Sequence, residues 1–289
     1  APIYLPREQK DHLLIEIPGS VESQMDLLFS APVTERFGKK VGIIYPDNAQ
    51  GTAYLDEFWR QAITRNIEVA GIAAYDKHST DFREPVKRIL GLESNRARQE
   101  EYDLFSEVYA NEKSAIRRIQ ILRPQVHFNW MLIVANPKEA MQIIPSFAYF
   151  DAFHVNFWGG PSWRSSFLQK QSARLGKLYF VSDYEEEKEN EFTREFIRIN
   201  KSKPRLLESR SYDALSILTH TLGEKKVEGR EEFDLYLREK KQIIGVTGQW
   251  SLRDGIWIKL MTPLQFQNNE IARMFGPNEG ITIQNAASE

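Results

Sequence analysis

The sequence contains no cysteine, which excludes thiolate catalysis, disulfide bridges and thiolate metal ligands. It also lacks an uninterrupted apolar run of about 18 to 20 residues, the length that a membrane-spanning helix needs. Positive and negative charges are nearly balanced, since 38 Lys and Arg against 40 Asp and Glu give a net charge of −2. The chain therefore has no excess of positive charge that would indicate binding to nucleic acid or to an anionic membrane surface. The chain begins APIYLPREQK, without Met or a signal peptide, as expected of a mature or trimmed polypeptide.

Motifs for nucleotide and metal chemistry are also missing. Neither G-x-G-x-x-G nor G-x-x-x-x-G-K-[ST] occurs, and the five histidines are scattered without metal-ligand spacing. Gly160, Pro161 and Ser162 begin a G-x-S-x-G turn, but Trp163 and Arg164 follow instead of completing it. We therefore expect a non-enzymatic protein with no cofactor and no metal site, and keep a divergent Rossmann-type enzyme only as a third hypothesis.

The most informative stretch is Lys39 to Gly51, KKVGIIYPDNAQG. Its short apolar run, Val41 to Tyr45, is typical of a strand buried on both faces of a parallel sheet. Residues 52–63 follow with apolar side chains at helical spacing, and Val69 to Tyr75 form a second buried-type strand. This order predicts a βαβ unit.

Further strands alternate with helices along the chain. Buried-type strands are predicted at 128–135, 155–158 and 178–181, and helices at 82–90, 137–144, 192–200, 209–222 and 230–240. A strand is also predicted at 13–17, a hairpin at 247–252 and 256–260, a strand at 264–266, and an irregular tail after Asn268. The fold class is therefore α/β, with a mostly parallel sheet flanked by helices.

The charged region from Glu93 to Arg123 is far longer than a usual connection between a helix and a strand. Its apolar residues are spaced for one or two amphipathic helices, so we interpret it as an inserted helical arm. The arm is either a solvated helical face without a special role or a surface that binds a partner.

Candidate ligand-binding residues follow the ends of the predicted strands, where an open α/β sheet usually meets its ligand. They are Asn48, Gln50, Asn136, Ser162 and Trp163. Amide, hydroxyl and aromatic groups can hydrogen-bond and stack on a ligand without reacting with it. The alternative is that these residues only form turns, helix caps and core contacts.

The ordered series KKVGIIYPDNAQG, AAYDKHSTDFREPVKRI, FNWMLIVANPKEAMQIIP, VNFWGGPSW, SYDAL and TGQWSLRDG resembles type I periplasmic binding proteins of the Leu/Ile/Val-binding class. The segment LGLESNRARQE resembles the branch of penicillin-binding-protein activator lipoproteins. The resemblance implies two Rossmann-like lobes with a ligand in the cleft between them. It assigns 1–30 to a remnant of the first lobe, 31–184 to a complete lobe with a helical insertion at 93–123, 185–254 to helices and a hairpin that complete the first lobe, and 255–289 to a crossing strand and a C-terminal tail.

The chain departs from amino-acid-binding relatives at their ligand positions. Gln50 stands where an aromatic residue precedes Gly51, Asn136 stands at a second expected aromatic contact, and Ser162 lies near where a carboxylate would pair with the ligand amine. An ammonium left unpaired in a closed cleft costs several kcal/mol, so a free amino acid is disfavoured as the ligand.

Two functions follow from this resemblance. The first is a periplasmic domain, or an outer-membrane-anchored lipoprotein facing the periplasm, that regulates an envelope partner such as a peptidoglycan synthase. The alternative is a solute-binding protein of an ABC transporter or sensor that binds a small polar ligand in the interlobe cleft. No nucleic-acid partner is expected in either case.

Overall fold

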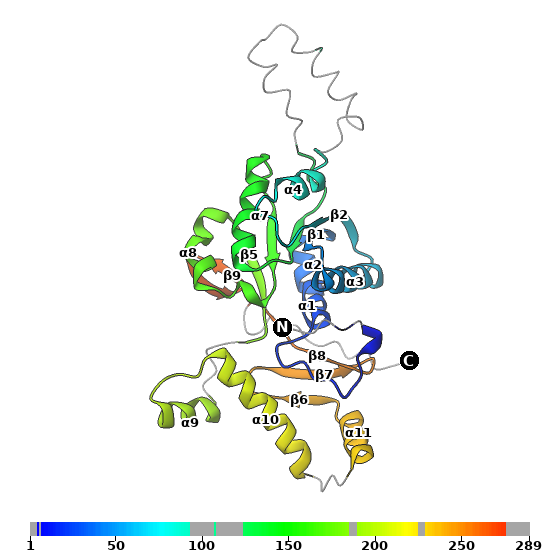
Figure 1. Cartoon of the computed structure of the whole chain (residues 1–289), viewed down its shortest axis with the longest axis vertical. Helices are drawn as coiled ribbons and strands as arrows, with labels where there is room; N and C mark the ends of the chain where they lie inside the picture. The colour runs from blue at the N-terminus through cyan, green and yellow to red at the C-terminus, as the bar shows by residue number, and fades with distance from the viewer. Residues whose placement is uncertain are drawn as a thin grey trace.

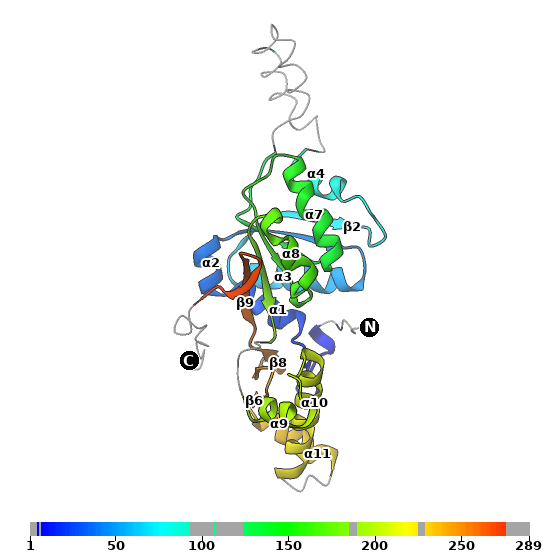
Figure 2. The same cartoon turned by 90° about the vertical axis from the view of Figure 1, so that its left-hand side faces the viewer.

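The computed structural model describes residues 5, 7–92, 107, 124–184, 190–224 and 229–275, and shows two sheets of unequal size. In Figure 1 the larger sheet with its helices lies above the smaller one, and Figure 2 shows the same stack from the side. The arm expected at 93–123 lies almost wholly outside the described residues. None of the described helices is long and apolar enough to cross a bilayer.

The larger sheet has seven strands in the order β10-β9-β5-β4-β3-β1-β2. They are β1 (Lys40–Pro46), β2 (Glu68–Tyr75), β3 (Trp130–Ile133), β4 (Asn156–Gly159), β5 (Leu178–Ser182), β9 (Thr262–Gln267) and β10 (Glu270–Arg273). Strands β1 to β5 pair with one another in parallel, while β9 is antiparallel to β5 and to β10. The predicted α/β class with a mostly parallel sheet is confirmed.

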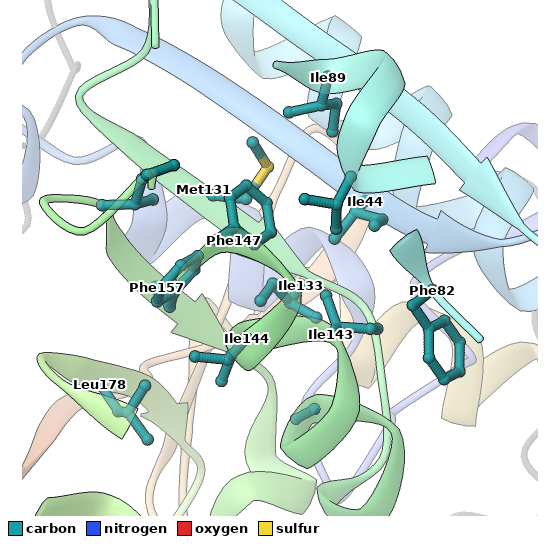
Figure 3. Close-up of a cluster of buried hydrophobic side chains, with 14 of the residues drawn as sticks. Ile44, Phe82, Ile89, Met131, Ile133, Ile143, Ile144, Phe147, Phe157 and Leu178 are labelled. Atoms are coloured by element: carbon teal, nitrogen blue, oxygen red, sulfur yellow. The ribbon is translucent and has the colours of Figure 1, made fainter. Parts of the chain in front are cut away.

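Helices cover both faces of this sheet, which explains why its central strands are apolar on both sides. One face packs against α1 (Val21–Leu28), α2 (Ala31–Phe37) and α3 (Ala49–Thr64). The other packs against α4 (Arg83–Ile89), α7 (Pro137–Tyr149) and α8 (Ser166–Leu175). Figure 3 shows this second core, where Ile143, Ile144 and Phe147 of α7 meet Met131 and Ile133 of β3.

The turn between β1 and α3 is fixed by its sequence. The Asn48 side chain accepts a hydrogen bond from Gly51 N at 3.0 Å and so caps α3. A Cβ atom on residue 51 would lie 1.8 Å from Pro46 O, so only glycine fits there. The first turn of α3 is thereby held against the carboxyl end of β1.

The smaller sheet is antiparallel, with strand order β6-β7-β8. Its strands are β6 (Gln242–Ile244), β7 (Gln249–Arg253) and β8 (Ile256–Lys259), and its neighbouring helices are α9 (Glu191–Asn200), α10 (Leu206–Glu224) and α11 (Arg230–Glu239). Asp254 and Gly255 join β7 to β8 with φ of 48° and 77°, as a two-residue hairpin turn with positive φ requires. The predicted hairpin is confirmed.

The strand predicted at 13–17 does not form. The core of the smaller sheet packs against Leu13, Ile15 and Ile17. The backbone carbonyl groups in this segment accept hydrogen bonds from indole N–H groups and do not pair with another strand. Trp250 Nε1 donates to Glu16 O at 3.1 Å, and Trp257 Nε1 donates to His12 O at 2.8 Å. The alternating apolar pattern correctly indicated burial on one side, but not the hydrogen-bond partners.

The irregular tail predicted after Asn268 is wrong for residues 270–273, and its residues from 276 on lie outside the described part of the chain. Asn268 and Asn269 adopt positive φ of 52° and 62° and turn the chain into β10, which pairs with β9. Asparagine tolerates this conformation better than most residues, so the Asn-Asn pair is a hairpin signal.

The larger unit draws on more of the chain than 31–184. Helix α1, assigned from sequence to 1–30, packs into the core that contains α3, and β9 and β10 extend the larger sheet from beyond residue 254. Two further short 3-10 helices complete the described elements, η1 (Arg7–Gln9) and η2 (Pro161–Trp163).

The two units are joined by buried charges around Lys259, whose side chain is fully buried. Lys259 Nζ donates to Ile17 O at 2.8 Å and to Thr247 Oγ1 at 2.9 Å, and lies 3.6 Å from Asp183 Oδ2 at the end of β5. Asp183 also accepts two hydrogen bonds from Arg210 Nη2 of α10, at 2.8 and 2.9 Å. Groups from β5, α10, β8 and the N-terminal segment therefore meet at one point.

Burial lowers the pKa of Lys259 to about 8 from its ordinary value of 10.5. Between these values the unfolded chain binds more protons than the folded one, so stability rises with pH in this window. We expect Lys259 to contribute a gain of up to about 3 kcal/mol in the unfolding free energy between pH 8 and 10.5. Urea unfolding of the wild type and of Lys259→Met across this range measures it; parallel pH profiles of the two proteins would contradict the assignment.

Candidate functional site

A cleft of about 720 Å³ lies at the carboxyl edge of the larger sheet. Val134 and Ala135 after β3, Gly160 and Ser162 after β4, and the first turns of α3 form one side. The other side is formed by the N-terminal segment, residues 7–19, and by the start of α1. This is the edge at which open α/β sheets bind ligands.

A buried charge trio lines the cleft. Lys10 Nζ lies 2.8 Å from both Glu16 Oε2 and Glu22 Oε2, and the side chains of Lys10 and Glu22 are only 6% and 5% exposed. Burial by itself would lower the pKa of Lys10, but the hydrogen bonds to the two carboxylates outweigh it and raise the pKa. Lys10 is therefore a firmly protonated cation shared by two anions.

Two further polar pairs line the cleft wall. Arg60 Nε donates to Glu57 Oε2 at 2.7 Å on α3, and this hydrogen bond raises the pKa of Arg60. Tyr54 Oη donates to Gln24 Oε1 at 2.8 Å, which connects α3 to α1. Gln24 and Tyr54 are both more than 90% buried, so their positions are fixed by packing.

Two of the five predicted site residues, Gln50 and Ser162, line the cleft. Gln50 is in the first turn of α3, and Ser162 is in η2 directly after β4. The fold brings these residues together from positions more than 100 residues apart because both follow parallel strands of one sheet. Their role in binding stays a prediction.

Asn48 and Asn136 act as helix caps and are not among the residues that line the cleft. The Asn136 side chain accepts hydrogen bonds from Lys138 N and Glu139 N. In return, the Glu139 carboxylate accepts a hydrogen bond from Asn136 N at 2.8 Å. This reciprocal pattern is a capping box that uses the oxygen of the asparagine side chain. The contacts of Asn48 and Asn136 are those of helix caps, which is the alternative interpretation of these two residues.

Trp163 is a core residue and does not face the cleft. Its side chain is fully buried, and its Nε1 donates to Ala135 O at 3.1 Å. A Cβ atom on Gly159 would lie 2.0 Å from the indole ring, so the ring packs directly on the backbone of β4. The large buried area of a tryptophan explains why packing prevails over ligand stacking here.

Sequence reasoning missed Lys10, Glu22, Gln24 and Tyr54, which line the cleft. Glu22 and Gln24 lie in the first turns of α1, where acidic and polar residues usually serve only the helix terminus. No local motif marks the approach of the N-terminal segment. Within the described ranges, no group of three or more His, Asp or Glu side chains is arranged to hold a metal ion.

No protein-family model matches the chain, and no curated protein sequence matches it. Several solved structures match the chain in fold. A protein of Rhodospirillum rubrum described as a branched-chain amino acid ABC transporter aligns with a TM-score of 0.63 at 13% identity, over 89% of this chain and 66% of its own. The leucine-binding protein LivK of Thermotoga maritima aligns at 0.61 and 13% identity, over 93% and 70%.

A branched-chain amino acid ABC transporter periplasmic ligand-binding protein of Burkholderia xenovorans aligns with a TM-score of 0.57 at 11% identity, over 92% of this chain and 66% of its own. The chain therefore has the fold of type I periplasmic binding proteins of the Leu/Ile/Val-binding class, as the sequence predicted. It spans about two thirds of the length of these structures.

Replacing Trp163 with Phe removes the hydrogen bond to Ala135 O and leaves a cavity beneath β4. We expect Trp163→Phe to lower the unfolding free energy by about 1 to 3 kcal/mol in urea titration. Trp59→Phe is the matched control because Trp59 is 40% exposed, and its effect should stay below about 0.5 kcal/mol. Equal losses in the two variants would contradict a core role for Trp163.

Proposed function

We propose that this chain is a non-enzymatic binding module that holds a small polar molecule in its cleft. The observation that carries the proposal is the cleft of about 720 Å³ at the carboxyl edge of the parallel strands, lined by Gln24, Gln50, Tyr54 and Ser162. Its volume is in the range of ligand pockets, and it combines apolar walls with a few polar groups that can orient a ligand. The structural neighbours support the same class of function, since they are named as ligand-binding proteins or ABC transporter components.

Delivery of this ligand to a transporter or a sensor is the role that we favour. Two of the neighbours are named as ABC transporters or parts of one, and one of these is named as periplasmic, so we place this chain in the periplasm as well. They favour this solute-binding role over regulation of a peptidoglycan synthase. The regulator hypothesis depended on the arm at 93–123, which lies almost wholly outside the described residues, and on the absence of the ligand groups of amino-acid-binding relatives.

Native mass spectrometry of the gently purified protein tests the proposal first. We expect a complex heavier than 33.6 kDa that releases a small molecule on activation. A mass of the bare chain, with no small molecule released, would contradict a ligand-binding role.

Substitutions in the cleft then locate the site. Gln50→Ala and Ser162→Ala should each weaken binding of the released molecule about tenfold, which corresponds to about 1.4 kcal/mol. Gln242→Ala and Ser202→Ala are matched controls, because both residues are exposed and lie outside the cleft lining. Unchanged affinity in both cleft variants would place the ligand elsewhere.

A further inference from the structure

Carboxylates outnumber cations among the described residues that line the cleft. The acidic side chains are Glu8, Glu16, Glu22, Asp56 and Glu57, and the basic ones are Arg7, Lys10 and Arg60. A concave site lined by an excess of one charge concentrates its field and attracts ligands of the opposite charge. The surplus of acid in the cleft therefore favours cations over anions.

After these groups are paired, part of the surplus negative charge remains in the wall of the cleft. Arg60 is bound to Glu57, and Arg7 is 3.5 Å from Asp254 outside the cleft, so each of these cations already has an anion. Lys10 is the single positive charge between Glu16 and Glu22. The trio keeps one net negative charge, and Glu16, whose side chain is 28% exposed, is the member that solvent or a ligand can reach.

Gln24 supplies a second, independent feature. It is 5% exposed and lines the cleft, and its amide oxygen is engaged by Tyr54. In the part of the chain that the structure describes, its amide nitrogen makes no hydrogen bond. This nitrogen is not fully buried, so it is a donor that an acceptor oxygen in the cleft can reach.

We propose, resting on the assignment of the cleft as the ligand site, that the ligand is an organic amine that also carries a carbonyl or hydroxyl oxygen. Its ammonium lies beside the Lys10–Glu16–Glu22 trio and offsets the remaining negative charge. Its oxygen accepts a hydrogen bond from the Gln24 amide. Molecules whose only charge is a carboxylate or phosphate are rejected, because every cation in this part of the cleft is already paired.

A matched series on one carbon skeleton tests this selectivity by calorimetry with the full chain at about pH 6.5, where an α-amine is protonated. The probes are L-leucinamide (cation), L-leucine (zwitterion), 4-methylpentanamide (neutral) and 4-methylpentanoate (anion). We expect L-leucinamide to bind at least tenfold more tightly than the neutral amide or the anion, and at least threefold more tightly than L-leucine. Raising NaCl from 50 to 500 mM should weaken L-leucinamide binding severalfold.

Two substitutions with opposite signs then assign the charge. Glu16→Gln makes the trio neutral and should weaken L-leucinamide binding at least fivefold, while leaving 4-methylpentanamide within twofold. Lys10→Met removes the competing ammonium and should strengthen L-leucinamide binding; if this variant does not fold, Glu16→Gln alone decides. Glu270→Gln on β10, an exposed carboxylate outside the cleft lining, should change nothing.

The failure of this inference differs from failure of the proposed function. Equal or tighter binding of the neutral amide or the anion, or release of an uncharged or anionic molecule in native mass spectrometry, overturns the amine assignment but leaves the cleft as a binding site. Absence of binding by all four probes also overturns the amine assignment. The cleft itself is excluded as the ligand site only if Gln50→Ala and Ser162→Ala both leave the affinity for the released molecule unchanged.

Discussion

The arrangement of the two units depends on the buried contact between Lys259 and Asp183. Lys259 ends β8 of the smaller sheet, and Asp183 follows β5 of the larger one. An ion pair without exposed surface is costly to break by removing one partner, because the other charge is then left buried. Arg210, Thr247 and the Ile17 carbonyl complete the hydrogen bonds that make such a site tolerable.

The same contact sets the shape of the cleft. Lys259 N also donates to Ser23 Oγ at 2.9 Å, so β8 is tied to the first turn of α1 next to Gln24. Through Ile17, Lys259 holds the N-terminal segment from which Lys10 and Glu16 reach into the cleft. The polar groups that the N-terminal segment and α1 contribute to the cleft therefore belong to elements that one buried cation keeps in place.

The five residues expected to bind a ligand have different roles in the structure, and the local structure around each one sets its role. All five follow the ends of buried strands at the edge of the sheet that borders the cleft. Asn48 and Asn136 each occupy the residue before a helix, where their oxygen atoms satisfy backbone N–H groups. Gln50, two residues after Asn48, and Ser162, after β4, line the cleft, while Trp163 next to Ser162 is in the core. Positions one residue apart thus differ in role, which strand-end patterns cannot resolve.

The sequence by itself determined the α/β class, strands β1 to β5 of the larger sheet, the β7–β8 hairpin and the strand-end loops that border the cleft. These features are encoded locally, in apolar runs, caps and turn residues whose effects extend over a few positions. Only the tertiary structure brought Lys10, Glu16 and Glu22 to one point, set Gln24 against Tyr54, and placed residues 13–17 over the tryptophans of the smaller sheet. Such contacts join segments without a shared pattern in the sequence, and they form because buried charges and donors must find partners wherever the fold places them.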